Sequence, residues 1–135
     1  EAILLNIDGN VAEGSGQNLF YVKDSIVHTN DETSSILLGI TRESILTICK
    51  ELNIETRVHS FSLEDLLSSD EVFFTGTASE VTPIRSIEDN LISNGEVGSV
   101  TLKLRAYYMD IVLGNNQRYN HWLSILNHDV PVKNP

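Results

Sequence analysis

Two short apolar runs joined by a tight turn limit the fold from the outset. The runs are NLFYV at residues 18–22 and IVHT at residues 26–29, with the turn KDS between them. Short apolar runs on either side of a polar turn are typical of a β-hairpin. A third run, EVFFTG at residues 71–76, reads as a buried strand that stops at its glycine. The chain is therefore expected to build a sheet that contains an antiparallel pair.

Helical spacing appears in two other segments. The first predicts a helix within the stretch ILLGITRESILTICKELN and rests on Ile45, Ile48, Cys49 and Leu52. Thr41 is expected at its N-cap, and Glu43 suits the positive end of the helix in its first turn. The second predicts a longer helix and rests on Val100, Leu104, Tyr107, Tyr108 and Ile111. Trp122 and Leu123 are expected to close the core.

Shorter elements complete the expected fold. AILLNI at residues 2–7 and the alternating IETRVHS at residues 54–60 read as strands, and SLEDLLSS at residues 62–69 as a short helix. EVTPIRSI at residues 80–87 is extended, and its Pro83 places it at a sheet edge or a bend. Strands and helices alternate without a strict βαβ repeat, so the predicted class is α+β around a mixed sheet.

Composition excludes several kinds of function. The 135 residues suffice for one domain with a real core, and the net charge of −10 argues against a nucleic-acid face. The nine basic residues are scattered along the chain, and no apolar run is long enough to span a membrane. A cytoplasmic protein without a nucleic-acid or membrane partner is expected. Because the first residue is Glu1 and a strand-like run follows at once, we expect a piece of a longer chain.

The cysteine and histidine content gives no support for metal or redox chemistry. Cys49 is the single cysteine and lies on the apolar side of its predicted helix, so it is expected to be a core thiol. The four histidines show no metal-ligand spacing with one another or with this cysteine: His28, His59, His121 and His128. No metal site is predicted.

Three glycine-containing turns are candidates for a binding site, and all of them adjoin predicted strands or helices. Glu13 precedes Gly14 and Gly16, LGIT at residues 38–41 opens the first helix, and TGTAS at residues 75–79 follows a strand. A helix N-terminus attracts phosphate because its free N–H groups and its dipole both favour an anion. Each turn alone is common, so the order and combination of the three carry the interpretation.

That combination resembles the signature of the class IV aminotransferases, which use pyridoxal phosphate (PLP). The matching positions are Glu13, Asn18, Leu19, Phe20, Thr29, Leu37, Gly39, Ile40 and Arg42. Within the class, TSSILLGITR at residues 33–42, the pattern FxxGTAxEVTPI at residues 73–84 and the ending GNNQRYNHWL are most similar to the branched-chain amino acid aminotransferases. The stretch TNDETSS departs from the pattern, because many relatives have a proline after the threonine.

The resemblance implies a fold and an assembly. Residues 1–127 would be the C-terminal, larger domain portion, a mixed-sheet pseudo-barrel with helices packed outside, and residues 128–135 a tail. The parent would be a cytoplasmic homodimer of branched-chain amino acid biosynthesis with a smaller N-terminal domain. It would move an amino group between Leu, Ile or Val and 2-oxoglutarate.

The resemblance also implies residue roles. Glu13 would bind the pyridine nitrogen of PLP, where a carboxylate keeps the ring protonated and electron-accepting. The backbone N–H groups of Ile40 and Thr41 would hold the phosphate, with the Thr77 hydroxyl opposite. The amides around Thr77 and Ala78 would receive the substrate carboxylate. Asn18 is expected only to brace its turn.

A PLP aminotransferase also needs a lysine that binds the cofactor covalently and carries a proton. The chain has Lys23, Lys50, Lys103 and Lys133, and none stands at the family position, which lies upstream of Glu1. No catalytic residue is therefore predicted within the chain, and the chain alone is expected to be inactive, with or without PLP. Arg42 is expected to point to solvent.

Three other functions remain open. A D-amino acid aminotransferase or an aminodeoxychorismate lyase would keep PLP and change the substrate. A non-catalytic domain derived from the same fold would lack the lysine in its parent gene as well. A hydrolase with a carboxylate pair would need Glu13 and Glu80 to converge on one pocket.

Overall fold

The computed structural model describes residues 1–124, and the expected tail at residues 128–135 lies outside them. Its strands and α-helices, in chain order, are β1 (Ile3–Leu5), β2 (Val11–Gly14), β3 (Asn18–Lys23), β4 (Ile26–Thr29), α1 (Ile40–Glu51), β5 (Thr56–Val58), α2 (Leu63–Leu67), β6 (Glu71–Gly76), β7 (Glu80–Pro83), β8 (Ser86–Ile87), β9 (Asn90–Leu91) and α3 (Ser99–Val112). The predicted helices and strands are thus present. β1, β5 and α2 are shorter than the runs that predicted them, whereas β4 and β6 match their predicted bounds.

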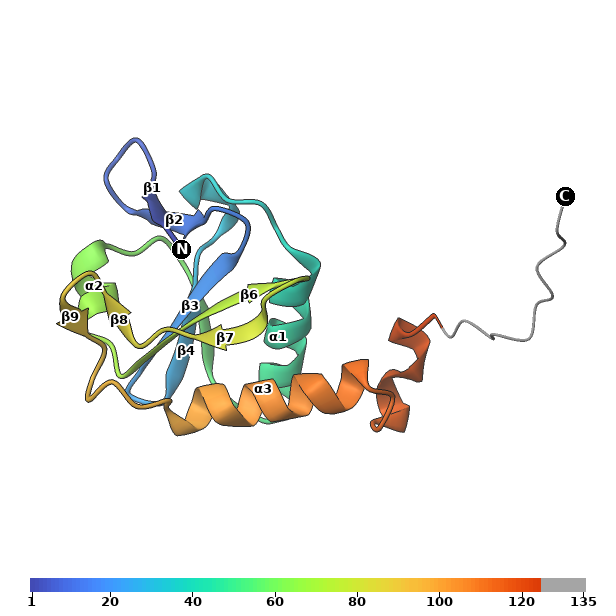
Figure 1. The fold of residues 1–135 in the computed structure, drawn as a ribbon. Helices are drawn as coiled ribbons and strands as arrows, with labels where there is room; N and C mark the ends of the chain where they lie inside the picture. The colour runs from blue at the N-terminus through green and yellow to red at the C-terminus, as the bar shows by residue number, and fades with distance from the viewer. Residues whose placement is uncertain (125–135) are drawn as a thin grey trace, which may run out of the picture.

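A five-stranded mixed sheet forms the centre of the molecule (Figure 1). Its strand order is β5-β4-β3-β6-β7; β4 and β5 run parallel, and the other neighbours are antiparallel. β3 and β4 form the predicted hairpin, with Lys23 opposite Ile26. Asp24 and Ser25 between them both have positive φ, which is the backbone of a type I′ turn. The α+β class with a mixed sheet is confirmed.

Successive side chains of β3 point to opposite faces of the sheet, and both faces are buried. Phe20 and Val22 join the cluster under α1 and α3, and Phe20 stacks on Phe73 of β6. Leu19 and Tyr21 join the opposite cluster, which α2, β2 and the residue directly after β9, Ile92, complete. Figure 1 shows α1 and α3 packed against the central sheet, with α2 and the β8–β9 pair at its far end. This double burial explains why LFYV at residues 19–22 is apolar without a break.

The start of α1 differs from the sequence prediction. Gly39 is the N-cap, and Thr41 lies inside the first turn with its side chain buried. The prediction of Thr41 as N-cap is therefore wrong, because the chain reaches the helix in an extended conformation at the glycine. Arg42 was expected in solvent but is only 3% exposed, since its guanidinium turns inward and donates to the carbonyl of Asn30 at 2.7 Å.

The C-terminal end of the described chain also contains a correction. Trp122 is 39% exposed, so it does not close the core as expected. The 3₁₀ helix η2 (Gln117–Trp122) instead turns Tyr119 inward, and Trp122 packs edge-on against that ring with centroids 4.4 Å apart. Tyr119 also donates to Glu51 at the end of α1. Because Glu51 on α1 accepts a hydrogen bond from Tyr119, the tyrosine rather than the tryptophan is buried.

Cys49 is fully buried, and burial raises the pKa of its thiol to about 12, which confirms a core thiol. Within residues 1–124, no helix combines the length and apolar character needed to cross a membrane.

Candidate functional site

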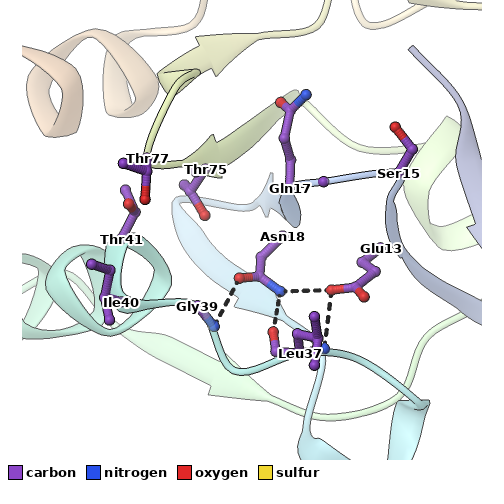
Figure 2. A pocket seen from close by; sticks show the side chains of 12 residues that line it. Glu13, Ser15, Gln17, Asn18, Leu37, Gly39, Ile40, Thr41, Thr75 and Thr77 are labelled. Carbon is purple, nitrogen blue, oxygen red and sulfur yellow. Dashed lines mark hydrogen bonds between the residues drawn. The ribbon is translucent and has the colours of Figure 1, made fainter.

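A pocket of about 210 Å³ lies where β3 begins, β6 ends and α1 begins (Figure 2). Twelve residues line it: Glu13, Ser15, Gly16, Gln17, Asn18, Leu37, Gly39, Ile40, Thr41, Thr75, Gly76 and Thr77. All three turns selected from the sequence contribute to this list, although they are far apart in the chain. The fold therefore brings the three candidate motifs into one pocket.

Pairing of the central strands brings two of these turns together. β3 and β6 are antiparallel neighbours, with Asn18 directly opposite Thr75. The first residue of β3 therefore meets the last residues of β6. The turn before β3 is closed by a hydrogen bond of 2.7 Å from the N–H of Gly14 to the carbonyl of Gln17. A Cβ at Gly14 would lie 2.8 Å from the ring of Phe74, so this turn packs on the sheet only with glycine.

Glu13 and Asn18 form the polar network at one end of the pocket. Glu13 Oε2 accepts from Asn18 Nδ2 at 3.0 Å and from the N–H of Leu37 at 3.1 Å. Asn18 Nδ2 also donates to the carbonyl of Leu37 at 2.7 Å, and Asn18 Oδ1 accepts from the N–H of Gly39 at 3.1 Å. Figure 2 draws these contacts as one connected set. Asn18 thus braces far more than its own turn, which the sequence prediction underestimated.

The N-terminus of α1 forms the second part of the pocket. The N-cap Gly39 has no side chain to bond the first-turn N–H groups, and Ile40 and Thr41 follow it along the pocket wall. Free N–H groups at a helix start carry the positive end of the helix dipole. The arrangement therefore offers an anion a binding surface made of backbone.

The turn between β6 and β7 forms the third part of the pocket wall. Thr77 lines the pocket, whereas Ala78 and Glu80 are not among the lining residues. The structure thus brings Glu13, Ile40, Thr41 and Thr77 together but leaves Ala78 on the exposed part of the turn. Glu80 and Glu13 do not meet in the pocket, so the geometry required for a carboxylate-pair hydrolase is absent from the described residues.

Among the lining residues, Glu13 is the single ionisable side chain. The described lysines lie elsewhere: Lys23 donates to the carbonyl of Ser68, and Lys50 and Lys103 are exposed on α1 and α3. Within residues 1–124 the pocket therefore contains neither a lysine nor an arginine. Lys133 lies outside the described residues.

One cluster away from this pocket escaped the sequence prediction. His28 and His59, which are far apart in the chain, lie with Nδ1 and Nε2 2.9 Å apart. The parallel pairing of β4 with β5 places them near one another, since His28 pairs with Arg57 two residues before His59. Sequence spacing gives no sign of such a contact. The described residues contain no group of three or more side chains suited to hold a metal ion.

Comparisons with known proteins agree with these features. The family model for class IV aminotransferases matches residues 1–87. A probable branched-chain-amino-acid aminotransferase of Aquifex aeolicus is 46% identical over 125 residues, which is 92% of this chain and 40% of the relative. The branched-chain-amino-acid aminotransferase of Escherichia coli K12 is 41% identical over 127 residues, 94% of this chain and 41% of the relative. The chain thus spans about two fifths of these relatives.

Solved structures give the same result for the fold. A T.th. branched-chain amino acid aminotransferase complexed with N-(5′-phosphopyridoxyl)-L-glutamate is similar with a TM-score of 0.91 and 44% sequence identity. The match covers 94% of this chain and 43% of the aminotransferase chain. The branched-chain aminotransferase of Thermoproteus uzoniensis with norvaline is similar with a TM-score of 0.88 and 41% sequence identity. The match covers 92% of this chain and 41% of the Thermoproteus chain. Given the family match over residues 1–87 and these likenesses in sequence and fold, the chain belongs to the class IV aminotransferases.

Proposed function

We propose that this chain is the larger-domain part of a PLP-dependent aminotransferase that moves an amino group between branched-chain amino acids and 2-oxoglutarate. The convergence of a carboxylate and an uncapped helix N-terminus in one pocket is the observation that carries the proposal. A branched-chain substrate is favoured because the similar proteins and structures named above are branched-chain aminotransferases. The D-amino acid and lyase alternatives have no such support.

The pocket residues fit PLP at its two polar ends. Glu13 Oε2 is held by Asn18 and Leu37, whereas the described residues give Oε1 no hydrogen-bond partner. A carboxylate held in this way is a suitable partner for a protonated ring nitrogen. The N–H groups of Ile40 and Thr41 and the hydroxyl of Thr77 would hold the phosphate, because such donors favour an anion.

When bound, PLP supplies an aromatic ring that accepts the electron pair left as a bond at the substrate Cα breaks. Glu13 would support this chemistry by keeping a proton at the ring nitrogen. The backbone amides at the start of α1 would fix the phosphate and so the orientation of the ring. The turn at Thr77 and Ala78 would receive the substrate carboxylate through its exposed amides.

The remaining parts of the site would come from sequence outside this chain. The pocket has no lysine to hold the cofactor covalently and no cation to balance a phosphate among the described residues. Its volume of about 210 Å³ is below the roughly 300–1,000 Å³ of typical ligand sites. We therefore propose that an upstream lysine and a smaller N-terminal domain complete it in a cytoplasmic homodimer.

The test uses the longest natural reading frame that contains this sequence. We expect it to contain a lysine upstream of Glu1 and to transaminate leucine, isoleucine and valine with 2-oxoglutarate when PLP is added. The 135-residue chain, assayed in parallel, should be inactive. A preference for D-alanine would indicate the D-amino acid alternative, and absence of the lysine would indicate a non-catalytic relative.

A further inference from the structure

Asn18 lies at the junction of the three segments that form the polar part of the pocket. It begins β3, while Glu13 belongs to β2, and Leu37 and Gly39 precede α1. The side chain is 5% exposed, and its single carboxamide bonds to all three of these residues. Such a position makes Asn18 a link between elements, and the resemblance gave it no role in cofactor binding.

We propose that Asn18 is a positioning residue that sets the separation between the Glu13 carboxylate and the phosphate-binding end of α1. This inference rests on the proposed function. The PLP ring is rigid and its phosphate stands on a short arm, so the two partners must lie within a narrow range of separations for both to bind well. β2 and α1 each supply one partner, and the Asn18 carboxamide connects them directly.

The chemistry of the contacts requires an amide at this position. Nδ2 donates to Glu13 Oε2 and to the carbonyl of Leu37, whereas Oδ1 accepts from the N–H of Gly39. An ionised carboxylate could accept from Gly39 but could not donate, and an aliphatic side chain could do neither. Gly39 is matched to this arrangement, because a Cβ there would lie 2.3 Å from Asn18 Oδ1.

Two substitutions separate positioning from simple structural support. Asn18→Leu removes every contact at similar volume. Asn18→Asp keeps the acceptor for Gly39 but puts a second carboxylate beside Glu13. Such a pair takes up a proton more readily than either group alone, and the protonated form can donate to the other carboxylate. The defect of Asn18→Asp should therefore shrink as the pH falls.

Asn30 supplies the matched control. It is also buried, at 1% exposure, and its Nδ2 donates to the carbonyl of Val11 at 2.7 Å, yet it does not line the pocket. Asn30→Asp and Asn30→Leu report the cost of disturbing a buried asparagine in general. Circular dichroism and urea unfolding of all four variants monitor folding.

The measurement is the binding of pyridoxamine 5′-phosphate, which forms no covalent bond to lysine, to the longest natural chain containing this sequence. We expect Asn18→Leu to weaken binding roughly tenfold or more at every pH, as for loss of hydrogen bonds to a charged group. Near pH 8, Asn18→Asp should bind the ligand as weakly as Asn18→Leu does. Near pH 5, its affinity should move back towards that of the wild type. The absorption spectrum of the bound ligand should report less ring-nitrogen protonation in Asn18→Leu than in the wild type.

The outcomes separate this inference from the proposed function. Wild-type affinity in the Asn18 variants would overturn it, as would equal losses in the Asn18 and Asn30 variants or no acid recovery of Asn18→Asp. Failure of the wild-type protein to bind pyridoxamine 5′-phosphate would overturn the proposed function and this inference together.

Discussion

At the scale of the residue, Glu13 is the side chain on which the proposed chemistry depends most. Glu13→Gln keeps an oxygen that can accept from Asn18 and Leu37, so the local structure should persist. A neutral amide cannot hold a proton at the ring nitrogen. We expect kcat of the longest natural chain to fall by roughly 100-fold or more. Steady-state assays with leucine and 2-oxoglutarate, alongside the cofactor absorption spectrum, measure this effect.

The exposed Glu64 on α2 provides the control for this substitution. Glu64→Gln removes the same charge far from the pocket and should leave both kcat and the spectrum unchanged. If Glu13→Gln behaved in the same way, the proposed role of Glu13 would be wrong.

At the scale of the element, α3 is capped by a side chain from the sheet. Its N-cap Gly98 has no side chain, and Glu71 of β6 accepts instead from Val100 N at 3.0 Å, Thr101 N at 2.7 Å and Thr101 Oγ1 at 2.6 Å. Glu71→Ala leaves these donors buried and unpaired. We expect a loss of about 2–3 kcal/mol in the free energy of unfolding, measured with urea.

Glu96, which is exposed two residues before the helix cap, offers a matched control. Glu96→Ala should change the free energy of unfolding by less than about 0.5 kcal/mol. Equal effects of the two substitutions would show that the cap is not specific to Glu71.

The contact between β4 and β5 predicts a pH dependence of stability. His59 Nδ1 lies 2.8 Å from the Ser60 carbonyl and so donates to it, which leaves Nε2 to accept from His28 Nδ1. Burial lowers the pKa of His28 below its ordinary 6.5, and the neighbouring His59 and Arg57 lower it further. Below pH 6.5 the unfolded chain therefore binds more protons than the folded one.

Above pH 6.5, the His28 imidazole therefore takes nothing from the free energy of unfolding. The free energy of unfolding declines as the pH falls from 6.5 towards the lowered pKa of His28. Urea unfolding near pH 7.5 and near pH 5 measures the decline. His28→Asn should reduce the difference between the two conditions, whereas His121→Asn, on the exposed end of the described chain, should preserve it. A decline that is equal in both variants would exclude His28 as its source.

At the scale of the whole molecule, large apolar side chains are exposed around the pocket and the first turn. Leu37, Ile40 and Ile7 are 79%, 77% and 99% exposed. Burying such surface is favourable, whereas the net charge of −10 opposes association. We expect the isolated chain to associate as its concentration rises and more strongly at high salt, which screens the repulsion.

Sedimentation velocity over a range of concentrations at low and high salt measures this association. Leu37→Ser and Ile40→Ser together should weaken it. Leu46→Ser, at a partly buried position of α1 itself, serves as a destabilising comparison. A sharp, concentration-independent monomer under all conditions would contradict the expectation.

Local patterns in the sequence were sufficient to predict the main helices and strands and to recognise the family motifs in their order. The hairpin around Asp24 and Ser25, the helix through Ile45 and Ile48, and the strand that ends at Gly76 were each predicted from a residue pattern within one short segment. Such periodicity records which side of an element is buried. The family resemblance likewise follows from residue types at fixed spacing, and the family match confirms it.

Directions of individual side chains were decided only by the tertiary structure. The sequence placed Arg42 in solvent and Trp122 in the core, but the Asn30 carbonyl draws the arginine inward and Glu51 selects Tyr119 for burial. Asn18 likewise connects three segments that no local pattern relates. A side chain's partners depend on which distant element packs beside it, and that information is absent from the spacing of residues along one element.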